Sequence, residues 1–529
     1  MTPRQKISLL LEPPVGVLVS RVARSLAARG VSAYLAGGAL RDAVLGRPVR
    51  DVDVAVAGDS LATARAVGDD LGAAYVPLDP ERGIARLVFP AEEDEVRHVD
   101  FTPLRGDIAT DLASRDFTID AMAVALPGDD HFELEDPFGG REDLAKRIVR
   151  AVTPAVFEAD GLRLLRGVRL AAELGFHLDG PTLASMRERA GYLEGIAPER
   201  QREELVRMLA TGRASWALDT LDGLGLLQRI LPELAAARGV EQPKEHYWDV
   251  FDHSLRTVEA MDFLLAEHPP EETRWATFWR ELWGPLGWLP GGHEHFREGL
   301  SEGHPRLALV KLSALIHDIA KPETKTVDSR GRVRFFGHAA TGARMARAIM
   351  GRLRFSVRET RLVALLVEEH LRPGQLSSGG PPSRRALYRY FRDTGDAALD
   401  VLFLSLADHL AARGPRMRVT SWRNHVAYVN HIMARRHLEE SLVEPPRLVT
   451  GHDVMAALGI GPGPEVGQLL RAVEEAQGAG EIRTREDALA LVSRLAGPSV
   501  RQGGLPAGQA GAGGESPGAE AGRGREHGE

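Results

Sequence analysis

The chain has 529 residues and a formal net charge of −8, with 43% hydrophobic and 26% charged residues. This length favours three or four folded units, and the composition is that of a globular protein with ample core. The absence of cysteine excludes disulfides, zinc–thiolate sites and thiol nucleophiles. No apolar stretch reaches the roughly 18 residues of a membrane span and the N-terminus lacks a signal-peptide core, so a cytoplasmic location is expected. A nucleic acid would have to bind a local basic surface.

The first 150 residues are expected to form a mixed α/β unit, because short apolar runs alternate with helical stretches there. This unit contains a glycine turn, Gly37 and Gly38, which is followed by Arg41. The two glycines would let backbone N–H groups approach a triphosphate without a Cβ in the way. Two neighbouring glycines alone usually mark only a turn, so this motif needs support from the residues that follow.

That support comes from Asp51 and Asp53, which fall in an apolar run that predicts a strand. Residues two apart on a strand share one face, so both carboxylates could reach the same pair of magnesium ions. Two metals about 3.5–4 Å apart can hold the attacking and leaving oxygens of an in-line phosphoryl displacement. Asp100, on another expected strand, could be a third carboxylate that helps to activate a 3′ hydroxyl. A solvated aspartate on an edge strand would give the same pattern. The combined motifs indicate a phosphoryl-transfer site.

These motifs resemble the nucleotidyltransferase head of the class II tRNA nucleotidyltransferase and bacterial poly(A) polymerase family, whose fold is polymerase-beta-like. The family shows Gly-Gly-x-Val-Arg-Asp followed by Asp-x-Asp, and Leu40 stands here at the valine position. A later segment resembles the family's second motif, Arg-Arg-Asp-Phe-Thr-Ile-Asn-Ala, and departs from it at Ser114 and Asp120, which are not expected to be catalytic. The resemblance implies that Gly38, Arg41 and Arg115 hold the triphosphate and sugar of a nucleotide, and that Arg115 and Asp116 are the motif's sugar- and phosphate-contacting pair.

Apolar residues recur at helical spacing after the head, so residues 151–240 are expected to form a helical neck and body. Asp160 and Arg163 would lie one turn apart on one helix face, where an acceptor and a donor could read cytosine or adenine. In the family this motif selects the nucleotide without a template, and Arg166 and Arg169 match positions that meet the nucleotide. An ordinary surface salt bridge, worth under about 1 kcal/mol, would give the same pair.

A second metal centre is expected around His317 and Asp318, which close a long apolar run and should lie on a largely buried helix. Two adjacent polar side chains are costly there unless they bind a metal or each other. An ordered series resembles the HD superfamily of metal-dependent phosphohydrolases: His253, His317, Asp318, His338, His370 and Asp408. Imidazole and carboxylate suit Mg²⁺, Mn²⁺, Fe²⁺ or Ni²⁺, and the full series would permit two metals. His246 and His409 are expected to be ordinary polar residues.

The expected fold class is α+β, with an α/β head followed by all-α regions. The expected domains are the head at 1–150, a neck and body that bind base and RNA at 151–240, an HD domain at 241–415, a helical region at 416–496 and a tail at 497–529. An insertion at about 270–303 holds Trp275, Trp279, Trp283 and Trp288 and should pack on its own tryptophans. The tail is rich in Gly, Ala and Glu and is expected to be disordered.

The resemblance implies a template-independent tRNA nucleotidyltransferase that adds CMP, AMP or both from CTP and ATP to a tRNA 3′ end. Asp51 and Asp53 would hold Mg²⁺, pyrophosphate would leave, and tRNA would bind by shape and phosphates on arginine-bearing helices after Gly175. The HD unit would hydrolyse phosphoesters, such as a 2′,3′-cyclic phosphate. A poly(A) polymerase and enzymes that add only A or only CC share every motif. An HD signalling phosphohydrolase with a nucleotide-binding head and an RNA-binding scaffold are the other open alternatives.

Overall fold

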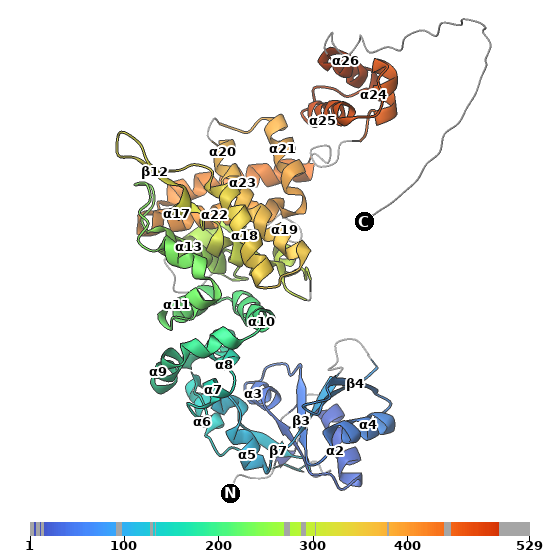
Figure 1. Ribbon diagram of the computed structural model, residues 1–529, viewed down its shortest axis with the longest axis vertical. Helices are drawn as coiled ribbons and strands as arrows, with labels where there is room; N and C mark the ends of the chain where they lie inside the picture. Colours follow the sequence, from blue (N-terminus) through green and yellow to red (C-terminus); the bar gives the residue numbers. More distant parts are fainter. Residues whose placement is uncertain are drawn as a thin grey trace, which may run out of the picture. The chain divides into compact units, whose positions relative to one another are not determined.

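The computed structural model describes residues 5–6, 11, 15–90, 98–126, 131–132, 134–268, 276–286, 292–301, 303–377, 380–438 and 446–496. These residues form a sheet-containing N-terminal head followed by helices, so the predicted α+β class is confirmed (Figure 1). The chain divides into two units, one made of residues 1–381 and 396–433, the other of residues 382–395 and 434–529.

The head is built on a seven-stranded sheet with the order β4-β5-β6-β3-β2-β7-β9 among the described residues. Its strands are β2 (Ala33–Ala36), β3 (Val52–Val56), β4 (Ala74–Asp79), β5 (Ile84–Val88), β6 (His98–Pro103), β7 (Ala123–Ala125) and β9 (Leu134–Glu135). β3 and β6 run parallel, whereas the other neighbours in this sheet run antiparallel. This parallel register sets Asp53 directly beside Asp100. A separate pair joins β1 (Gln5–Lys6) and β8 (His131–Phe132).

Helices cover the head sheet and connect its strands. They are α2 (Val15–Ala28), α3 (Gly38–Val44), α4 (Ser60–Leu71), α5 (Ile108–Ala113), the 3₁₀ turn η1 (Thr118–Asp120) and α6 (Gly140–Lys146). α4 begins where the Asp59 carboxylate accepts a hydrogen bond from the Ala62 N–H at 3.0 Å, and it ends at the left-handed Gly72. It packs on β3, β5 and β6, and α2 packs on α4. Buried Leu26, Val67 and Leu87 are part of the core of this layer.

The neck is helical, with one parallel two-stranded pairing of β10 (Ile148–Val149) and β11 (His177–Leu178). Its helices are α7 (Val156–Ala159), α8 (Leu162–Leu174), α9 (Gly180–Glu188), η2 (Ala190–Gly195), α10 (Pro198–Leu209), α11 (Ala214–Gly223), α12 (Leu227–Ile230) and η3 (Pro232–Ala237). The expectation that Asp160 and Arg163 share one helix face is wrong. Asp160 is extended, with φ −153° and ψ 108°, and separates α7 from α8.

The HD region is a bundle in which α13 packs on α16 and α22, and α16 packs on α19. Its elements are α13 (Val250–Leu264), α14 (Ala276–Leu286), α15 (Gly292–Arg297), α16 (Arg306–Ile316), α17 (Lys321–Thr324), β12 (Lys325–Val327), β13 (Val333–Phe335), α18 (His338–Arg352), α19 (Val357–Glu369), α20 (Arg372–Ser377), η4 (Gly395–Ala397), α22 (Ala398–Arg413), η5 (Gly414–Arg416) and α23 (Val419–Leu438). The apolar run that forms α16 is buried almost throughout, as the sequence predicts.

The tryptophan-rich insertion is only partly self-packed. The rings of Trp279 and Trp283 lie 6.4 Å apart, and their indole N–H groups donate to carbonyls of Ala266 and Leu264 at 3.2 and 3.0 Å. Trp283 also contacts Phe403 of α22, with ring centroids 5.8 Å apart, so the insertion packs on the bundle as well. Trp275 and Trp288 lie outside the described residues.

The second unit is a small helical body. It contains α21 (Arg384–Thr394), α24 (Gly451–Leu458), α25 (Pro464–Gly478) and α26 (Arg485–Leu495). Val454, Leu469 and Val492 form part of its apolar core, and α21 packs on α25. Residues 382–395, which fall within the range expected for the HD domain (241–415), pack with this unit. The expected tail at 497–529 lies outside the described residues.

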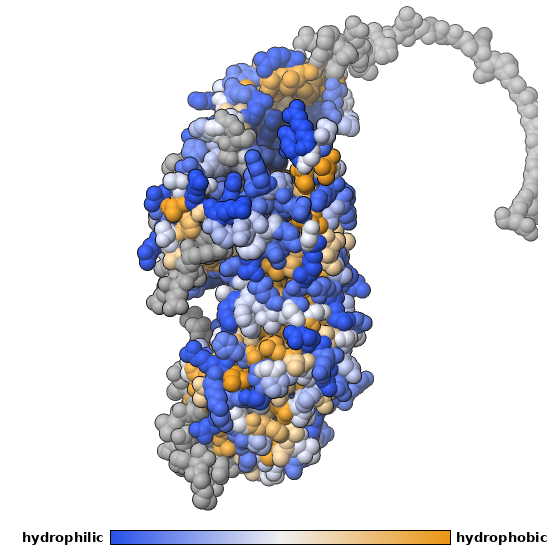
Figure 2. Space-filling model, turned by 90° about the vertical axis from the view of Figure 1, so that its left-hand side faces the viewer, coloured by the Kyte–Doolittle hydropathy of each residue, from blue (hydrophilic) through white to orange (hydrophobic). Residues whose placement is uncertain are grey.

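None of the described helices combines the length and the apolar character that spanning a bilayer requires. Figure 2 shows one face of the molecule with polar side chains over most of it and smaller apolar patches between them. This pattern is ordinary for a protein in water, because apolar atoms always cover part of a folded surface.

Gly161 follows the break at Asp160 and packs closely against the neck. A Cβ at this residue would lie 2.1 Å from the Tyr192 carbonyl oxygen, whereas a Cβ at Gly180 would meet no atom within 4 Å. We expect Gly161→Ala to lower the free energy of unfolding by about 1–3 kcal/mol, because backbone must move to relieve the clash. Gly180→Ala, the matched control, should leave stability unchanged or slightly higher. Thermal unfolding of both variants checks this, and equal midpoints would contradict the packing described here.

Candidate active site and metal centre

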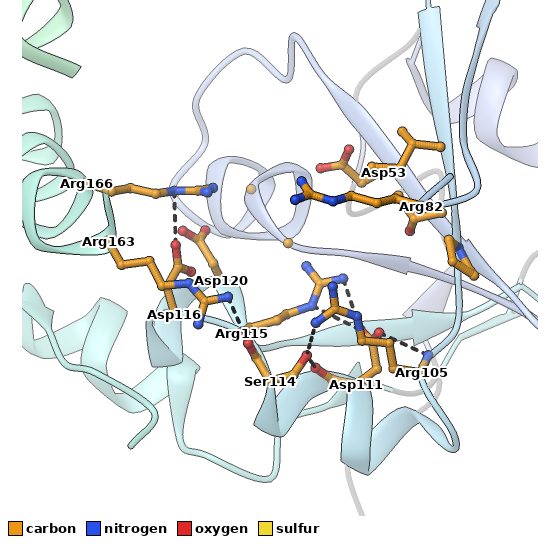
Figure 3. A pocket seen from close by; sticks show the side chains of 15 residues that line it. Asp53, Arg82, Arg105, Asp111, Ser114, Arg115, Asp116, Asp120, Arg163 and Arg166 are labelled. Carbon is orange, nitrogen blue, oxygen red and sulfur yellow. Dashed lines mark hydrogen bonds and ion pairs between the residues drawn. The ribbon is translucent and has the colours of Figure 1, made fainter. Parts of the chain in front are cut away.

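A cavity of about 580 Å³ opens in the head, between the sheet and the first helices of the neck (Figure 3). Its lining consists of Gly37, Gly38, Asp53, Arg82, Ile84, Thr102, Pro103, Arg105, Asp111, Ser114, Arg115, Asp116, Asp120, Arg163 and Arg166. Five of these residues are arginines and four are aspartates. Such a lining suits an anionic ligand together with a cation.

The glycine turn brings backbone close to the acidic side of this cavity. Gly37 links β2 to α3 with φ +85°, a conformation that favours glycine. A Cβ here would lie 2.8 Å from a terminal nitrogen of Arg115 and 3.7 Å from a carboxylate oxygen of Asp53. A larger residue would therefore push into the space where a ligand would meet both groups.

Asp53 is the lining carboxylate that lies next to two further aspartates, Asp51 and Asp100. Burial and the neighbouring charge of Asp100 raise the pKa of Asp53 to about 6, with a further contribution from Asp51. Asp100 accepts two hydrogen bonds from Arg86, at 2.7 and 2.8 Å. Asp51 immediately precedes β3, is 76% exposed and lies 3.0 Å from Nε2 of His98. Three carboxylates in mutual repulsion fit a divalent cation, although Asp51 and Asp100 do not belong to the cavity lining.

Two of the arginines that line the cavity are held by aspartates. Arg115 pairs with Asp111 at 3.3 Å and Arg166 with Asp116 at 3.0 Å. Figure 3 shows Arg163 and Arg166 reaching in from the neck, opposite Arg82 and Arg105. These pairs hold the guanidinium groups in place before a ligand arrives.

Arg41 is also paired, although it does not belong to the lining. It contacts Asp42 at 2.9 Å and Asp120 at 2.8 Å. Asp120 is 4% exposed, and burial raises the pKa of its carboxyl group. Asp120 departs from the family's second motif and was not expected to be catalytic, yet it lines the cavity.

The sequence analysis did not predict seven further lining residues: Arg82, Ile84, Thr102, Pro103, Arg105, Asp111 and Ser114. Arg82 lies in the turn between β4 and β5, and Arg105 follows β6, so sheet pairing brings them together. No local motif marks either arginine. Asp111 could have been found, because it stands four residues before Arg115 on one helical turn.

Two side chains that were expected to contact the nucleotide form hydrogen bonds with other parts of the protein. Asp160 accepts a hydrogen bond from Arg200 at 2.6 Å and another from the Leu162 N–H at 3.0 Å. Arg163 instead donates to backbone carbonyls of the neck and head. Arg169 is 3% exposed and forms ion pairs with Glu173 and Glu204, so the structure places it away from the cavity.

The HD series meets at one point in the bundle, as the sequence predicts. Nε2 of His253 lies 3.2 Å from Nε2 of His317, 3.5 Å from Oδ2 of Asp318 and 3.1 Å from Oδ1 of Asp408. On the other side, Oδ1 of Asp318 lies 3.4 Å from Nε2 of His338 and 3.7 Å from Nε2 of His370. The two oxygens of Asp318 thus face two separate groups of imidazoles.

The imidazoles are oriented for metal binding. His317, His338 and His370 each direct Nδ1 at the backbone carbonyl three residues earlier, at 2.9, 2.7 and 2.7 Å. A carbonyl only accepts hydrogen bonds, so Nδ1 carries the proton and Nε2 presents a lone pair to the centre. Burial also lowers the pKa of His370 to about 3, which keeps this ligand neutral.

Asp318 shows that the centre fits a cation. Its carboxylate is 1% exposed and neither oxygen accepts a hydrogen bond of regular geometry within the described chain. Lys321 approaches Oδ2 at 2.5 Å and supplies part of the positive charge. Divalent ions would supply the rest, because a buried carboxylate needs compensating charge.

His246 was expected to be an ordinary polar residue, but the structure places it in this cluster. Its ligand atom and those of His253 and Asp408 lie within 4.8 Å of one another. His409, in contrast, stacks on His425 with ring centroids 4.6 Å apart. The loop before α13 gave no helical or strand pattern from which the position of His246 could be derived.

Family models match three parts of the chain. The model described as poly(A) polymerase head domain matches residues 33–150, and the probable RNA and SrmB-binding site of polymerase A matches residues 175–238. The HD domain matches residues 250–413.

Two curated relatives are similar over most of their length. An A-adding tRNA nucleotidyltransferase of Deinococcus radiodurans is 35% identical over 472 residues, which cover 88% of this chain and 95% of the relative. A CC-adding tRNA nucleotidyltransferase of Thermus thermophilus is 35% identical over 468 residues, 87% of this chain and 93% of the relative. A solved structure of a Thermotoga maritima CCA-adding enzyme with tRNA has a TM-score of 0.57 at 18% identity, and covers 94% of this chain and 100% of that one.

The head, neck and HD matches define a nucleotidyltransferase-type protein with an attached HD domain. The chain belongs to the family of bacterial tRNA nucleotidyltransferases and poly(A) polymerases.

The raised pKa of Asp53 gives a test of the site without substrate. Its folded-state value of about 6 exceeds the ordinary 3.8, so the ionised carboxylate lowers stability as the pH rises through this range. In EDTA at pH 8, Asp53→Asn should raise the free energy of unfolding by about 1–3 kcal/mol, and the gain should fall to about half at pH 5.

Denaturant unfolding followed by circular dichroism at the two pH values measures this difference. Asp69→Asn on the exposed side of α4 is the control and should show no comparable gain. A destabilised Asp53→Asn protein in EDTA would contradict the repulsion inferred at β3 and β6.

Proposed function

We propose that this chain is a template-independent tRNA nucleotidyltransferase that adds CMP, AMP or both to tRNA 3′ ends and also hydrolyses phosphoesters at its HD centre. The observation that carries the transferase assignment is the cavity in which Asp53, beside Asp100, faces Arg115 and the glycine turn. The named relatives, one A-adding and one CC-adding, support tRNA as its RNA partner and A and C as the nucleotides that it adds. Such an enzyme would work in the cytoplasm, where tRNA is processed.

The residues of the cavity divide the work of nucleotidyl transfer. Asp51 and Asp53 would hold Mg²⁺, which neutralises charge on the phosphates and favours the 3′ hydroxyl as nucleophile. Gly37 and Gly38 leave room for the triphosphate beside backbone N–H groups, and Arg115 lies where it can bind a phosphate. Pyrophosphate leaves, and the protein contributes position and charge.

Other cavity residues would hold the rest of the nucleotide. Asp116 and its partner Arg166 lie at the neck side of the cavity, where a sugar could meet both. Asp100 would act through its negative charge, which adds to that of Asp53. Its own oxygens accept hydrogen bonds from Arg86.

Base selection is assigned to Arg163 and Asp160 of the neck. Arg163 lines the cavity, and Asp160 lies three residues before it at the break between α7 and α8. Asp160 is held by Arg200, which leaves its carboxylate ionised, since that pairing helps to lower its pKa despite partial burial. Both side chains keep hydrogen-bonding capacity beyond their contacts with Arg200 and with backbone carbonyls, so Asp160 could accept from a base and Arg163 could donate to it. Such a pair of contacts can favour cytosine or adenine over other bases.

The HD centre is assigned to metal-dependent hydrolysis of phosphoesters, with a 2′,3′-cyclic phosphate or a terminal phosphate of RNA as substrate. His253, His317, His338, His370, Asp318 and Asp408 would hold Mg²⁺, Mn²⁺, Fe²⁺ or Ni²⁺. A metal at such a site supplies a nucleophilic hydroxide and polarises a phosphoryl oxygen. The neutral Nε2 atoms and the two-sided Asp318 support this assignment.

The two sites should be separable by substitution. Asp53→Ala should lower nucleotide incorporation by about 10²–10³-fold or more, because the cation loses its ligand, and should leave phosphoester hydrolysis intact. His370→Ala should lower phosphoester hydrolysis and leave nucleotide incorporation intact. Labelled CTP and ATP with tRNA lacking its 3′ end measure incorporation, and product length separates addition of CCA, CC, A and poly(A). Hydrolysis without any incorporation by the parent protein would favour the signalling phosphohydrolase instead.

Base selection gives a second test. Asp160→Ala and Arg163→Ala should each reduce the preference for CTP and ATP over GTP and UTP by about tenfold or more. Arg189→Ala is the control, since Arg189 pairs with Glu158 in the same neck and does not line the cavity. The ratio of kcat/KM among the four nucleotides is the readout. An unchanged ratio in both variants would remove these residues from base selection.

A further inference from the structure

We propose that His246 is an additional metal ligand of the HD centre, and that it makes the two metal positions unequal. The inference rests on the HD function proposed above and adds a residue from outside the series His253, His317, Asp318, His338, His370 and Asp408. It also identifies which of the two ions would remain open to a phosphoester.

The position of His246 fits a ligand. It lies before α13, where its backbone N–H donates to the Pro243 carbonyl at 2.9 Å. Its ring meets the ring of His253 edge-on, at 81° and with centroids 5.3 Å apart. The ligand atoms of His246, His253 and Asp408 lie within 4.8 Å of one another. Ligand bonds of about 2.0–2.2 Å place two donors on one ion about 3–4.4 Å apart, so the cluster needs little adjustment.

A metal would also give the imidazole of His246, which is partly buried, a partner for its buried nitrogen. Its Nδ1 is buried and makes no hydrogen bond within the described ranges of the chain. Both oxygens of Asp318 share this property. Buried polar atoms are normally bonded, and a group of unpartnered ones in a single cluster indicates that something else binds there.

A ligand at His246 makes the centre asymmetric. On one side of the centre, His253 is grouped with His246 and Asp408, and it is also grouped with His317 and Asp318, whose Oδ2 lies 3.5 Å from its Nε2. An ion held by His253 could therefore draw its other ligands from these four residues. The other position has Oδ1 of Asp318, His338 and His370. A divalent ion that takes about six ligands would be nearly saturated at the first position and would keep about three places free at the second.

This difference separates the roles of the ions. An ion with few free positions is held tightly and serves structure and charge, whereas an ion with open positions binds water and substrate. The phosphoester would therefore bind on the side of His338 and His370. Asp318 connects the two positions, because each of its oxygens faces one of them.

Mn²⁺ binding tests the inference. Every protein carries Asp53→Asn, so that only the HD centre reports, and is freed of metal with EDTA before calorimetric titration with MnCl₂. The parent should bind two ions with unequal affinities. His246→Gln should weaken the tighter ion by about 10–100-fold and leave the weaker one unchanged, and His370→Gln should weaken the other ion.

His409→Gln is the matched control. His409 is another largely buried imidazole next to Asp408, but it contacts Ser421 at 3.2 Å and stacks on His425. Replacing His409 should leave the affinities for both Mn²⁺ ions unchanged. Thermal unfolding in EDTA shows whether each variant folds, and His246→Asn replaces His246→Gln if the latter does not.

The visible spectrum of bound Co²⁺ is a second readout, because it responds to the number of ligands. The spectrum of the tight ion should change in the His246 variant and not in the His409 variant. Unchanged Mn²⁺ affinities and an unchanged Co²⁺ spectrum in a folded His246 variant would overturn this inference and leave the HD function standing. A parent protein that binds no Mn²⁺ would overturn the HD function itself.

Discussion

Both candidate sites depend on the same physical constraint, which is carboxylate charge held close together with too little water to screen it. The parallel register of β3 and β6 sets Asp53 beside Asp100, and burial with this neighbouring charge raises the pKa of Asp53 to about 6. In the bundle, Asp318 is buried among imidazoles, and Lys321 lies close to its Oδ2. Each arrangement costs stability without a cation, so a bound metal ion would stabilise it.

The rest of the architecture supplies rigid supports for these charges. In the head, sheet pairing fixes the aspartates, and ion pairs such as Arg115–Asp111 hold the arginines that face them. In the bundle, helix ends aim imidazoles at a common point, and backbone carbonyls fix their tautomers. Preformed sites of this kind need little reorganisation when charge develops, which is how electrostatic catalysis operates.

Much of this could be predicted from sequence. The glycine turn, the Asp-x-Asp pair and the HD series are local or ordered motifs, and the α+β class follows from the apolar periodicity. The relation of Asp160 to Arg163 was predicted wrongly, because residue spacing alone cannot show that the backbone leaves the helix at Asp160. Arg82 and Arg105 were missed for a related reason, since only the pairing of β4, β5 and β6 brings them to the cavity.

The sequence by itself determined the chemical groups, their order and the periodicity of the elements that carry them. It was enough to establish the family and to predict two sites that need metal, because residue type and short spacing decide which ligands are available. Only the tertiary structure decided which groups meet: that Asp100 adjoins Asp53, that Asp160 pairs with Arg200, and that His246 joins His253. Such contacts join residues far apart in the chain, and their distances depend on packing that no local pattern encodes.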